Sequence, residues 1–182
     1  NGVVLTNNDT YYLDGMIIKY NAEGECEWAK GIGGSEENEI NAVATTSDGG
    51  IIAGGNFESD IIDLGNGVTL SRKGYSNGMI IKYDSSGECE WAKGIGGSDF
   101  DYINTVADTS DGEIIAGGYF QSSTIETDGK TLTNKGSTNG MILKITNKTG
   151  VPETQELTVE NTRKEFKITT DVQEIDGTKG GT

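Results

Sequence analysis

Apolar and polar residues alternate over short stretches of this chain, and turn residues separate the stretches. Residues 15–20 read GMIIKY, in which Met16, Ile18 and Tyr20 share one face. This two-residue period indicates a β-strand. The next residues, NAEG, have the composition of a tight turn, and ECEWAKG at 25–31 forms a second alternating stretch. The segment therefore predicts a β-hairpin.

A second pair of strands follows. INAVATT at 40–46 and IIAGGNF at 51–57 flank SDGG at 47–50, and an Asp-Gly pair between two strands is a hairpin signal. We expect the Asp side chain to cap this turn. Gly54 and Gly55 lie inside the later strand, where glycine indicates a bulge or the close approach of another backbone.

The four-strand pattern recurs along the chain. Gly15, Gly78 and Gly140 begin matching segments, which gives a period of about 62 residues and indicates a repeat architecture. The second copy has strand patterns and an Asp-Gly turn at 78–83, 88–94, 103–109, 110–113 and 113–120. A longer polar connection at 58–77 has room for a short edge strand.

Four short antiparallel strands cannot bury both faces of their sheet alone. Radial stacking of such sheets as blades of a β-propeller, with about four strands per blade, solves this problem. We therefore predict an all-β fold of β-propeller-type repeats with about two and a quarter blades. Trp28 and Trp91 occupy one fixed strand position in successive copies, and we expect them to fill the space between blades.

The repeats extend over residues 1–146, and 1–14 match the tail of a preceding copy. Residues 147–182 lack the pattern and contain the single proline, so they read as a linker followed by a further β module or a disordered tail. Alternating apolar residues at 157–159 and 166–168 favour short strands in that module.

Several motifs in combination resemble a known family. WAKGIGGS at 28–35, the TSDGG turn, IIAGG and GMIIKYDSSG at 78–87 are similar to the seven-bladed β-propeller (SBBP) type repeats of bacterial and archaeal extracellular proteins. The resemblance covers roughly residues 1–146. It implies a propeller in a secreted or surface-attached multidomain protein, and it implies no particular activity. In the family order, 40–46 would be strand A, followed by strands B, C and D.

A closed ring usually needs at least about four blades. We therefore expect a fragment of a larger ring, a ring completed by several chains, or an open array. Because an open array leaves sheet edges unpaired, we predict self-association of this chain.

The chain is strongly acidic, with 14 Lys and Arg against 29 Asp and Glu and a net charge of −15. This charge repels phosphate backbones and anionic membrane surfaces, so we expect no nucleic-acid partner. We also expect no membrane insertion, because no apolar run approaches the ~18 residues of a membrane span. Protein and carbohydrate ligands remain open.

Cys26 and Cys89 occupy the same position in successive copies. Such positions are usually too far apart for a disulfide, which requires Cα atoms within about 7 Å. We interpret both as small buried hydrophobic side chains. Cys26 and Trp28 are two residues apart, so we expect them on one face of their strand, with Glu25 and Glu27 on the other.

Acidic side chains gather in the connection that follows each ECEWAKG strand. They are Glu36, Glu37 and Glu39 in one copy and Asp99 and Asp101 in the other. Oxygen-rich loops can bind Ca²⁺, which takes about six to eight oxygen ligands. The acidic positions change between copies, so we favour solvated turns, with calcium as the alternative. We expect no other cofactor.

No catalytic constellation is evident. The chain has no histidine, which excludes Ser-His-Asp and Cys-His arrangements within it. The carboxylate pairs at 25–27 and 88–90 recur once per copy, whereas a catalytic pair usually appears once.

The strands are nearly identical between copies and the loops diverge, which favours recognition by loops. We therefore expect a non-catalytic extracellular binding or structural module of a bacterial surface or secreted protein, with its ligand held by loops at one rim. The alternative is an accessory or partial catalytic propeller of a secreted carbohydrate-active enzyme.

Overall fold

The computed structural model describes residues 3–7, 11–109, 111–146 and 172–175 of the chain. Every regular element in these residues is a β-strand. The strands are β1 (Gly15–Tyr20), β2 (Cys26–Ile32), β3 (Asn38–Thr45), β4 (Ile51–Phe57), β5 (Ile61–Asp63), β6 (Thr69–Ser71), β7 (Asn77–Tyr83), β8 (Cys89–Ile95), β9 (Asp101–Asp108), β10 (Glu113–Phe120), β11 (Thr124–Thr127), β12 (Lys130–Thr133), β13 (Asn139–Thr146) and β14 (Val172–Ile175). No helix in these residues is long and apolar enough to cross a membrane.

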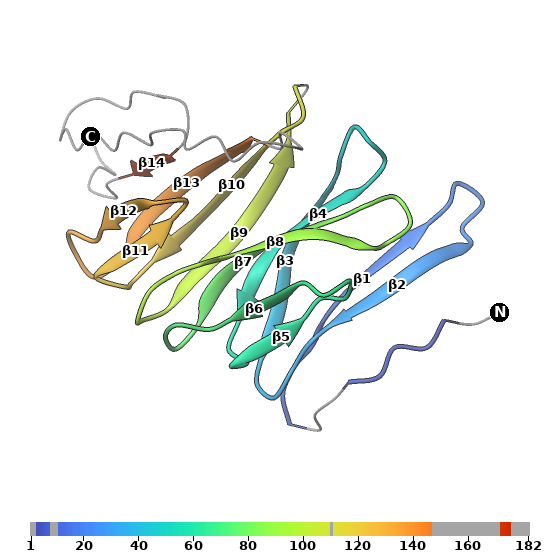
Figure 1. Ribbon diagram of the computed structural model, residues 1–182, viewed down its shortest axis with the longest axis horizontal. Helices are drawn as coiled ribbons and strands as arrows, with labels where there is room; N and C mark the ends of the chain where they lie inside the picture. The colour runs from blue at the N-terminus through green and yellow to red at the C-terminus, as the bar shows by residue number, and fades with distance from the viewer. Residues whose placement is uncertain (1–2, 8–10, 110, 147–171, 176–182) are drawn as a thin grey trace, which may run out of the picture.

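Three antiparallel sheets lie side by side across the molecule (Figure 1). Blade 1 is the pair β1–β2, blade 2 has the order β3–β4–β7–β8, and blade 3 has the order β9–β10–β13–β14. Blade 2 reproduces the A-B-C-D order that the repeat pattern predicted. The prediction of an all-β fold with propeller-type blades is confirmed, and no sheet closes on itself within the described ranges.

The fourth strand of blade 3 is one that the sequence analysis did not predict. β14 pairs antiparallel with β13, with Gly140 opposite Ile175 and Leu143 opposite Val172. It takes the position that β8 holds in blade 2, although its sequence lacks the Trp of ECEWAKG. The predicted strands at 157–159 and 166–168 lie outside the described residues.

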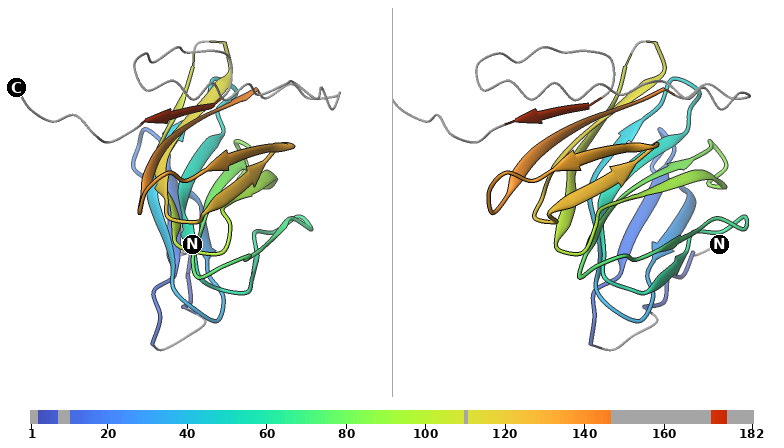
Figure 2. Two further views of the ribbon diagram at one scale, coloured as in Figure 1. Left: turned by 90° about the vertical axis from the view of Figure 1, so that its left-hand side faces the viewer. Right: turned by 60° about the vertical axis from the view of Figure 1, so that its left-hand side comes forward.

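Two small hairpins join the second and third strands of blades 2 and 3. β5 pairs with β6, and β11 pairs with β12. Both hairpins lie in front of the main sheets in Figure 1 and on one side of them in Figure 2. The connection at 58–77, which had room for one short edge strand, holds two short strands that pair with each other and not with a blade. Gly65 and Gly67 allow this reversal because both take positive φ, 87° and 75°.

The double glycines mark bulges, as predicted. A β-carbon on Gly55 would collide with the carbonyl oxygen of Glu39, and one on Gly118 with that of Tyr102. The pairing of strands A and B shifts register at both places. Only glycine permits the two backbones to approach so closely.

The blades pack face to face through two apolar cores. One core lies between blades 1 and 2, and the other lies between blades 2 and 3. Alternate residues of β4 and β7 face opposite cores, so every residue of these two strands is buried. The first core includes Ile17, Ile32, Met79, Ile81 and Tyr83, and the second includes Ile52, Ile80, Ile95, Ile103, Met141 and Leu143.

Trp28 crosses from blade 1 to blade 2, which confirms its predicted role between blades. Its side chain is 9% exposed, and its ring centroid lies 6.1 Å from that of Tyr83. The indole Nε1 donates a hydrogen bond to the Ser85 carbonyl at 3.1 Å. The Trp28 ring packs against Gly87, and a β-carbon at Gly87 would collide with this ring. Trp91, its counterpart, is only partly buried and packs against the second core.

The Cys and Trp of each copy do not share a face, contrary to the expectation from their spacing. In blade 2 the pairing shifts so that Tyr83 lies opposite Cys89. Lys82 lies opposite Trp91, and Glu90 is the additional residue of a β-bulge. Cys89 consequently faces the core between blades 1 and 2, whereas Trp91 faces the next core.

Both cysteines are free, and their environments differ. Cys89 is buried as expected, and this burial raises the pKa of its thiol to about 11. Cys26 is exposed, so the expectation of burial was wrong there. The reason is that no described sheet covers the outer face of blade 1.

We predict that Trp28→Ala will lower the free energy of unfolding by roughly 3 kcal/mol or more, since it removes a buried ring between two blades. Trp91→Ala is the matched control, because the same residue in the next copy is only partly buried. We expect it to cost less than roughly 2 kcal/mol. Urea denaturation measures both, and equal losses would contradict the assigned packing.

Candidate functional site

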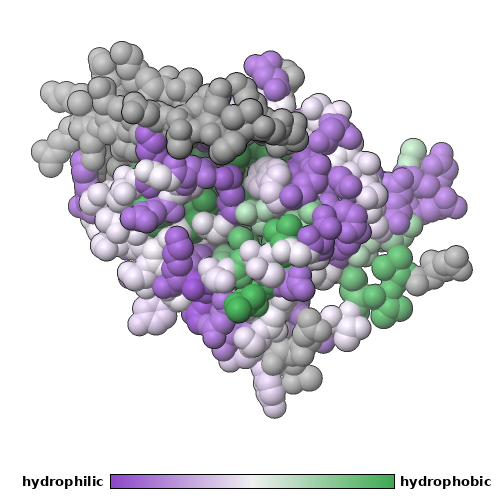
Figure 3. All heavy atoms as spheres, in the orientation of Figure 1, coloured by the Kyte–Doolittle hydropathy of each residue, from purple (hydrophilic) through white to green (hydrophobic). Residues whose placement is uncertain are grey.

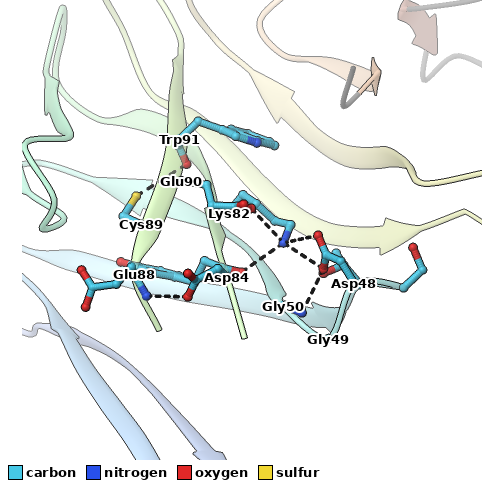
Figure 4. A network of polar contacts seen from close by, with 12 residues as sticks. Asp48, Gly49, Gly50, Lys82, Asp84, Glu88, Cys89, Glu90 and Trp91 are labelled. Atoms are coloured by element: carbon cyan, nitrogen blue, oxygen red, sulfur yellow. Dashed lines mark hydrogen bonds and ion pairs between the residues drawn. The ribbon is translucent and has the colours of Figure 1, made fainter. Parts of the chain in front are cut away.

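Lys82 is the centre of a polar network inside blade 2 (Figure 4). Its side chain is fully buried, and Nζ lies 3.0 Å from Asp48 Oδ2 and 3.1 Å from Glu90 Oε2. Nζ also donates to the carbonyl oxygen of Tyr83 at 3.1 Å. A buried ammonium group is costly unless it is paired and hydrogen-bonded, and this network satisfies it.

Asp48 holds the tight turn between β3 and β4, as predicted for SDGG. Its Oδ1 accepts hydrogen bonds from Thr46 Oγ1 at 2.6 Å and from the Gly50 amide at 2.9 Å. These two bonds and the Lys82 ammonium lower the pKa of Asp48 to about 2. Lys82 occupies the space that a β-carbon on Gly50 would need. The network therefore stabilises the turn.

The same lysine recurs in the other blades: Lys19 keeps the equivalent glutamate as a partner, and the remaining partners differ. Lys19 contacts Glu27 Oε2 at 3.1 Å and donates to the Ser85 carbonyl at 3.0 Å, which connects blade 1 to blade 2. Lys144 pairs with Glu113, the residue that stands where the first copy has glycine. Each lysine thus has a packing role.

Asp101 and Asp99, two of the predicted acidic residues, shape the connection before β9. Asp101 is buried, and its Oδ2 accepts from the Gly97 amide at 2.8 Å and from Ser122 Oγ at 2.6 Å. Asp99 Oδ1 accepts from the Phe100 amide at 3.0 Å. The Asp101 carboxylate is thus engaged in anchoring its own loop.

The preceding copy builds the same anchor without a carboxylate. Asn38 stands at the position of Asp101, and its Nδ2 donates to Ser59 Oγ at 2.9 Å and to the Glu36 carbonyl at 2.6 Å. The neutral amide of Asn38 thus takes the place of the Asp101 carboxylate. Holding this loop therefore does not require a charged side chain.

Glu36, Glu37 and Glu39 lie near Glu58 at the same rim. Burial and the charge of Glu37 raise the pKa of Glu58, and the charges of Glu36 and Glu39 raise it further. Arg72 acts in the opposite direction. Within the described part of the chain, no three His, Cys, Asp or Glu side chains are placed to hold a metal ion.

Four aromatic rings stack at this rim, and we call them the aromatic row. Tyr75 stacks on Phe100, with ring centroids 5.4 Å apart and planes 13° apart. Phe100 stacks on Tyr102 at 6.5 Å and 8°, and Tyr102 stacks on Tyr119 at 5.0 Å and 28°. The rings come from the connections before β7 and β9 and from the paired strands β9 and β10.

The sequence analysis missed the aromatic row because its members are far apart in the chain. A signal was nevertheless present in the comparison of copies. Phe100, Tyr102 and Tyr119 stand where the preceding copy has Glu37, Glu39 and Asn56. Three polar residues are thus replaced together by aromatic ones at a single edge of the repeat.

The outer face of blade 1 leaves a strip of apolar side chains exposed. Met16 is 63% exposed, Ile18 37% and Tyr20 59%. Their counterparts in blade 2 are Met79, Ile81 and Tyr83, exposed by 0%, 0% and 1%. Apolar residues also gather beside the N-terminal segment, at the right of Figure 3, where Val3, Val4 and Leu5 are exposed.

Part of the chain is similar to a viral repeat protein. It is 31% identical over 111 residues to the uncharacterized WD repeat-containing protein L264 of Acanthamoeba polyphaga mimivirus. The match covers 58% of this chain, and it spans only 8% of the relative. A comparison with models of known protein families gives no match.

WD repeats form four-stranded propeller blades with a period of about 40–45 residues, so this likeness agrees with the blades observed here. The longer period of this chain, about 62 residues, arises from the connections that hold β5–β6 and β11–β12. Each connection contains about twenty residues, and without it the repeat would have the length of a WD repeat. The expectation of a non-catalytic module agrees with likeness to a repeat protein of this type.

We predict that Asp48→Asn lowers stability at pH 7 and that its effect shrinks as the pH falls. The folded-state pKa of Asp48 is depressed from 3.8 to about 2. Its contribution is therefore present above pH 3.8 and is lost as the pH falls toward 2. Urea denaturation of both proteins at several pH values between 7 and 2 measures this difference.

Asp111→Asn is the matched control for this experiment, because in its turn Lys144 pairs with Glu113 instead. We expect a smaller loss of stability at pH 7 than for Asp48→Asn. A pH-independent effect of Asp48→Asn would contradict the assigned hydrogen bonds.

Proposed function

We propose that this chain is a non-catalytic binding module that holds its ligand at the rim carrying the aromatic row. The observation that supports it most is the contrast between constant strands and a changing rim. The residues that pack blade on blade are nearly the same in both copies, whereas the aromatic row occurs at one join only. Tyr75, the exposed member of the row, lies on a connection, and exposed aromatic side chains on loops held by a rigid scaffold are a common means of binding.

The location of the parent protein is part of the same proposal. The SBBP resemblance supports a bacterial surface or secreted protein, and the net charge of −15 favours solubility and argues against nucleic acid. The alternative is an accessory or partial catalytic propeller of a secreted carbohydrate-active enzyme. Cleavage of a glycan by a pair of carboxylates at the rim would favour this alternative.

We expect the protein to be retained on at least one member of a defined panel: cellulose, chitin, peptidoglycan and an immobilised Arg-Gly peptide. Tyr75→Ala should weaken this retention about fivefold, because it removes an exposed ring of the row. Tyr11→Ala is the control, as Tyr11 is also exposed, at 90%, but lies outside the row. Retention of the wild-type protein is measured by depletion from solution.

Three outcomes distinguish the hypotheses. Retention that depends on Tyr75 without release of reducing sugar supports a binding module. Release of reducing sugar from a polysaccharide would support the enzyme alternative. Retention on no member of the panel, or equal retention of the two variants, would overturn the proposed site.

We further propose that the outer face of blade 1 mediates self-association with a second copy of this chain. Met16 and Ile18 are exposed on β1. The corresponding strand in blade 2, β7, is fully buried. Burying such a strip again requires another sheet face, and a second copy supplies one. Two identical strips that meet form a closed, symmetric pair.

Light scattering should therefore give a mass above that of one chain, 19.3 kDa, at high protein concentration. The double variant Met16→Ser, Ile18→Ser should shift the mass toward the monomer. Val43→Ser is the control, because Val43 is 56% exposed on a different strand. A wild-type monomer would refute this contact, and a mass change on adding calcium would instead implicate the acidic loops.

A further inference from the structure

Tyr75 ends the aromatic row and presents an open ring face. Phe100 covers one side of the ring, yet the residue is 64% exposed, so the opposite side faces solvent. Stacking on Phe100 orients the Tyr75 ring, and Arg72 holds the backbone at this position. Arg72 Nη1 donates hydrogen bonds to the carbonyl oxygens of Gly74 and Tyr75 at 2.8 and 2.9 Å. A preorganised ring loses little conformational freedom on binding.

Several carboxylates lie at the same rim as the row, where the Glu58 amide donates a hydrogen bond to the Glu37 carbonyl at 2.8 Å. Burial raises the pKa of Tyr102, and the negative charges of Glu58 and Glu39 raise it further, so both carboxylates act on this ring. Glu36 and Glu37 act on Glu58 in turn. The row therefore borders on several negative charges.

Two cationic side chains, Arg72 and Lys73, come just before Tyr75 in the sequence. One of them is in an ion pair. Arg72 Nη2 pairs with Asp60 Oδ1 at 2.7 Å, so its charge is compensated locally. Lys73 is exposed two residues before Tyr75. Five acidic residues lie at the same rim as these two cations, so the local net charge is negative. The five are Glu36, Glu37, Glu39, Glu58 and Asp60.

We propose that the aromatic row binds a basic segment of a polypeptide, with an Arg or Lys side chain against the open face of Tyr75. This inference rests on the proposed binding function and names its ligand class. A cation is attracted to the face of an aromatic ring, and the neighbouring glutamates attract further basic residues of the same segment. An anionic ligand would be repelled, and a neutral polysaccharide would gain from the rings but not from the carboxylates.

Among the residues that the structure describes, the site occurs once. The preceding copy has Tyr12 at the position equivalent to Tyr75. It has no aromatic ring at the positions equivalent to the other three members of the row, which are Glu37, Glu39 and Asn56. The third copy has Ser137 at that position. The stoichiometry should therefore be one peptide per chain.

The test is isothermal titration of the intact chain with a synthetic peptide in which Arg and Gly alternate, at near-physiological salt. Tyr75→Ala should weaken binding at least about fivefold, because the open ring face is lost. Glu58→Gln should weaken it about threefold, because one neighbouring charge is lost. Near-UV circular dichroism confirms that each variant remains folded.

Matched controls separate this site from general attraction to an acidic protein. Tyr11→Ala removes an exposed tyrosine outside the row, and Glu23→Gln removes one exposed charge at the distant turn of blade 1. Both should bind as the wild type does. Equal weakening by Glu23→Gln and Glu58→Gln, or no effect of Tyr75→Ala, would overturn the proposal.

The result also distinguishes this inference from the proposed function. If the peptide does not bind but a polysaccharide is retained in a Tyr75-dependent manner, the ligand class is wrong and the binding module stands. If neither ligand depends on Tyr75, both proposals fail. Peptide binding that depends on Tyr75 and on Glu58 supports both.

Discussion

Each blade in this fold has two apolar faces, and a neighbouring blade is what covers them. Met79 is fully buried in blade 2, whereas Met16 at the same position in blade 1 is 63% exposed. Full burial of one such side chain contributes about 1.5–3 kcal/mol, and each blade presents several of them. The stability of every blade therefore depends on the blade beside it. Trp28 makes this dependence specific, because its ring and its indole N–H both find their partners in blade 2.

The spacing between blades follows from a few small backbone features. A β-carbon on Gly54 would press into the side chains of Ile103 and Val106 in blade 3. Beside it, the bulged residue Asn41 donates a hydrogen bond to the Ile103 carbonyl at 3.0 Å. The bulge and the glycine thus act together. The bulge directs the Asn41 side chain toward blade 3, and Gly54 leaves room for the side chains of blade 3. Substitutions here would alter the fit of two blades at once, which explains why these strands differ so little between copies.

The sequence predicted the blade strands β1–β4, β7–β10 and β13 and the role of Trp28, because each of these depends on local alternation and on the repeat itself, but it did not predict the hairpins β5–β6 and β11–β12. It could not predict that Cys89 and Trp91 face opposite cores, because one bulged residue reverses the alternation without changing the spacing. It also missed β14, because four residues without the repeat motif pair with β13 only through tertiary contact. The aromatic row was missed for a related reason, as its rings are brought together by the stacking of blades. Comparison of the two copies position by position would have revealed it.

The rim can vary because its anchors are buried, whereas several of the side chains that differ between copies are partly or fully exposed. Ser122 and Asp101 hold one loop, and Ser59 and Asn38 hold the other in the same way. The cross-strand neighbours at the edge of the sheet change as a pair. Tyr102 lies opposite Tyr119 in blade 3, and the same register in blade 2 places Glu39 opposite Asn56. The exchange at Glu39 changes a partly exposed side chain, whereas Asn56 is buried and its Oδ1 accepts a hydrogen bond from Asn41 Nδ2 at 2.9 Å, next to the join with blade 3. The copies therefore differ most at the rim, where the fixed anchors hold loops whose other side chains change from copy to copy.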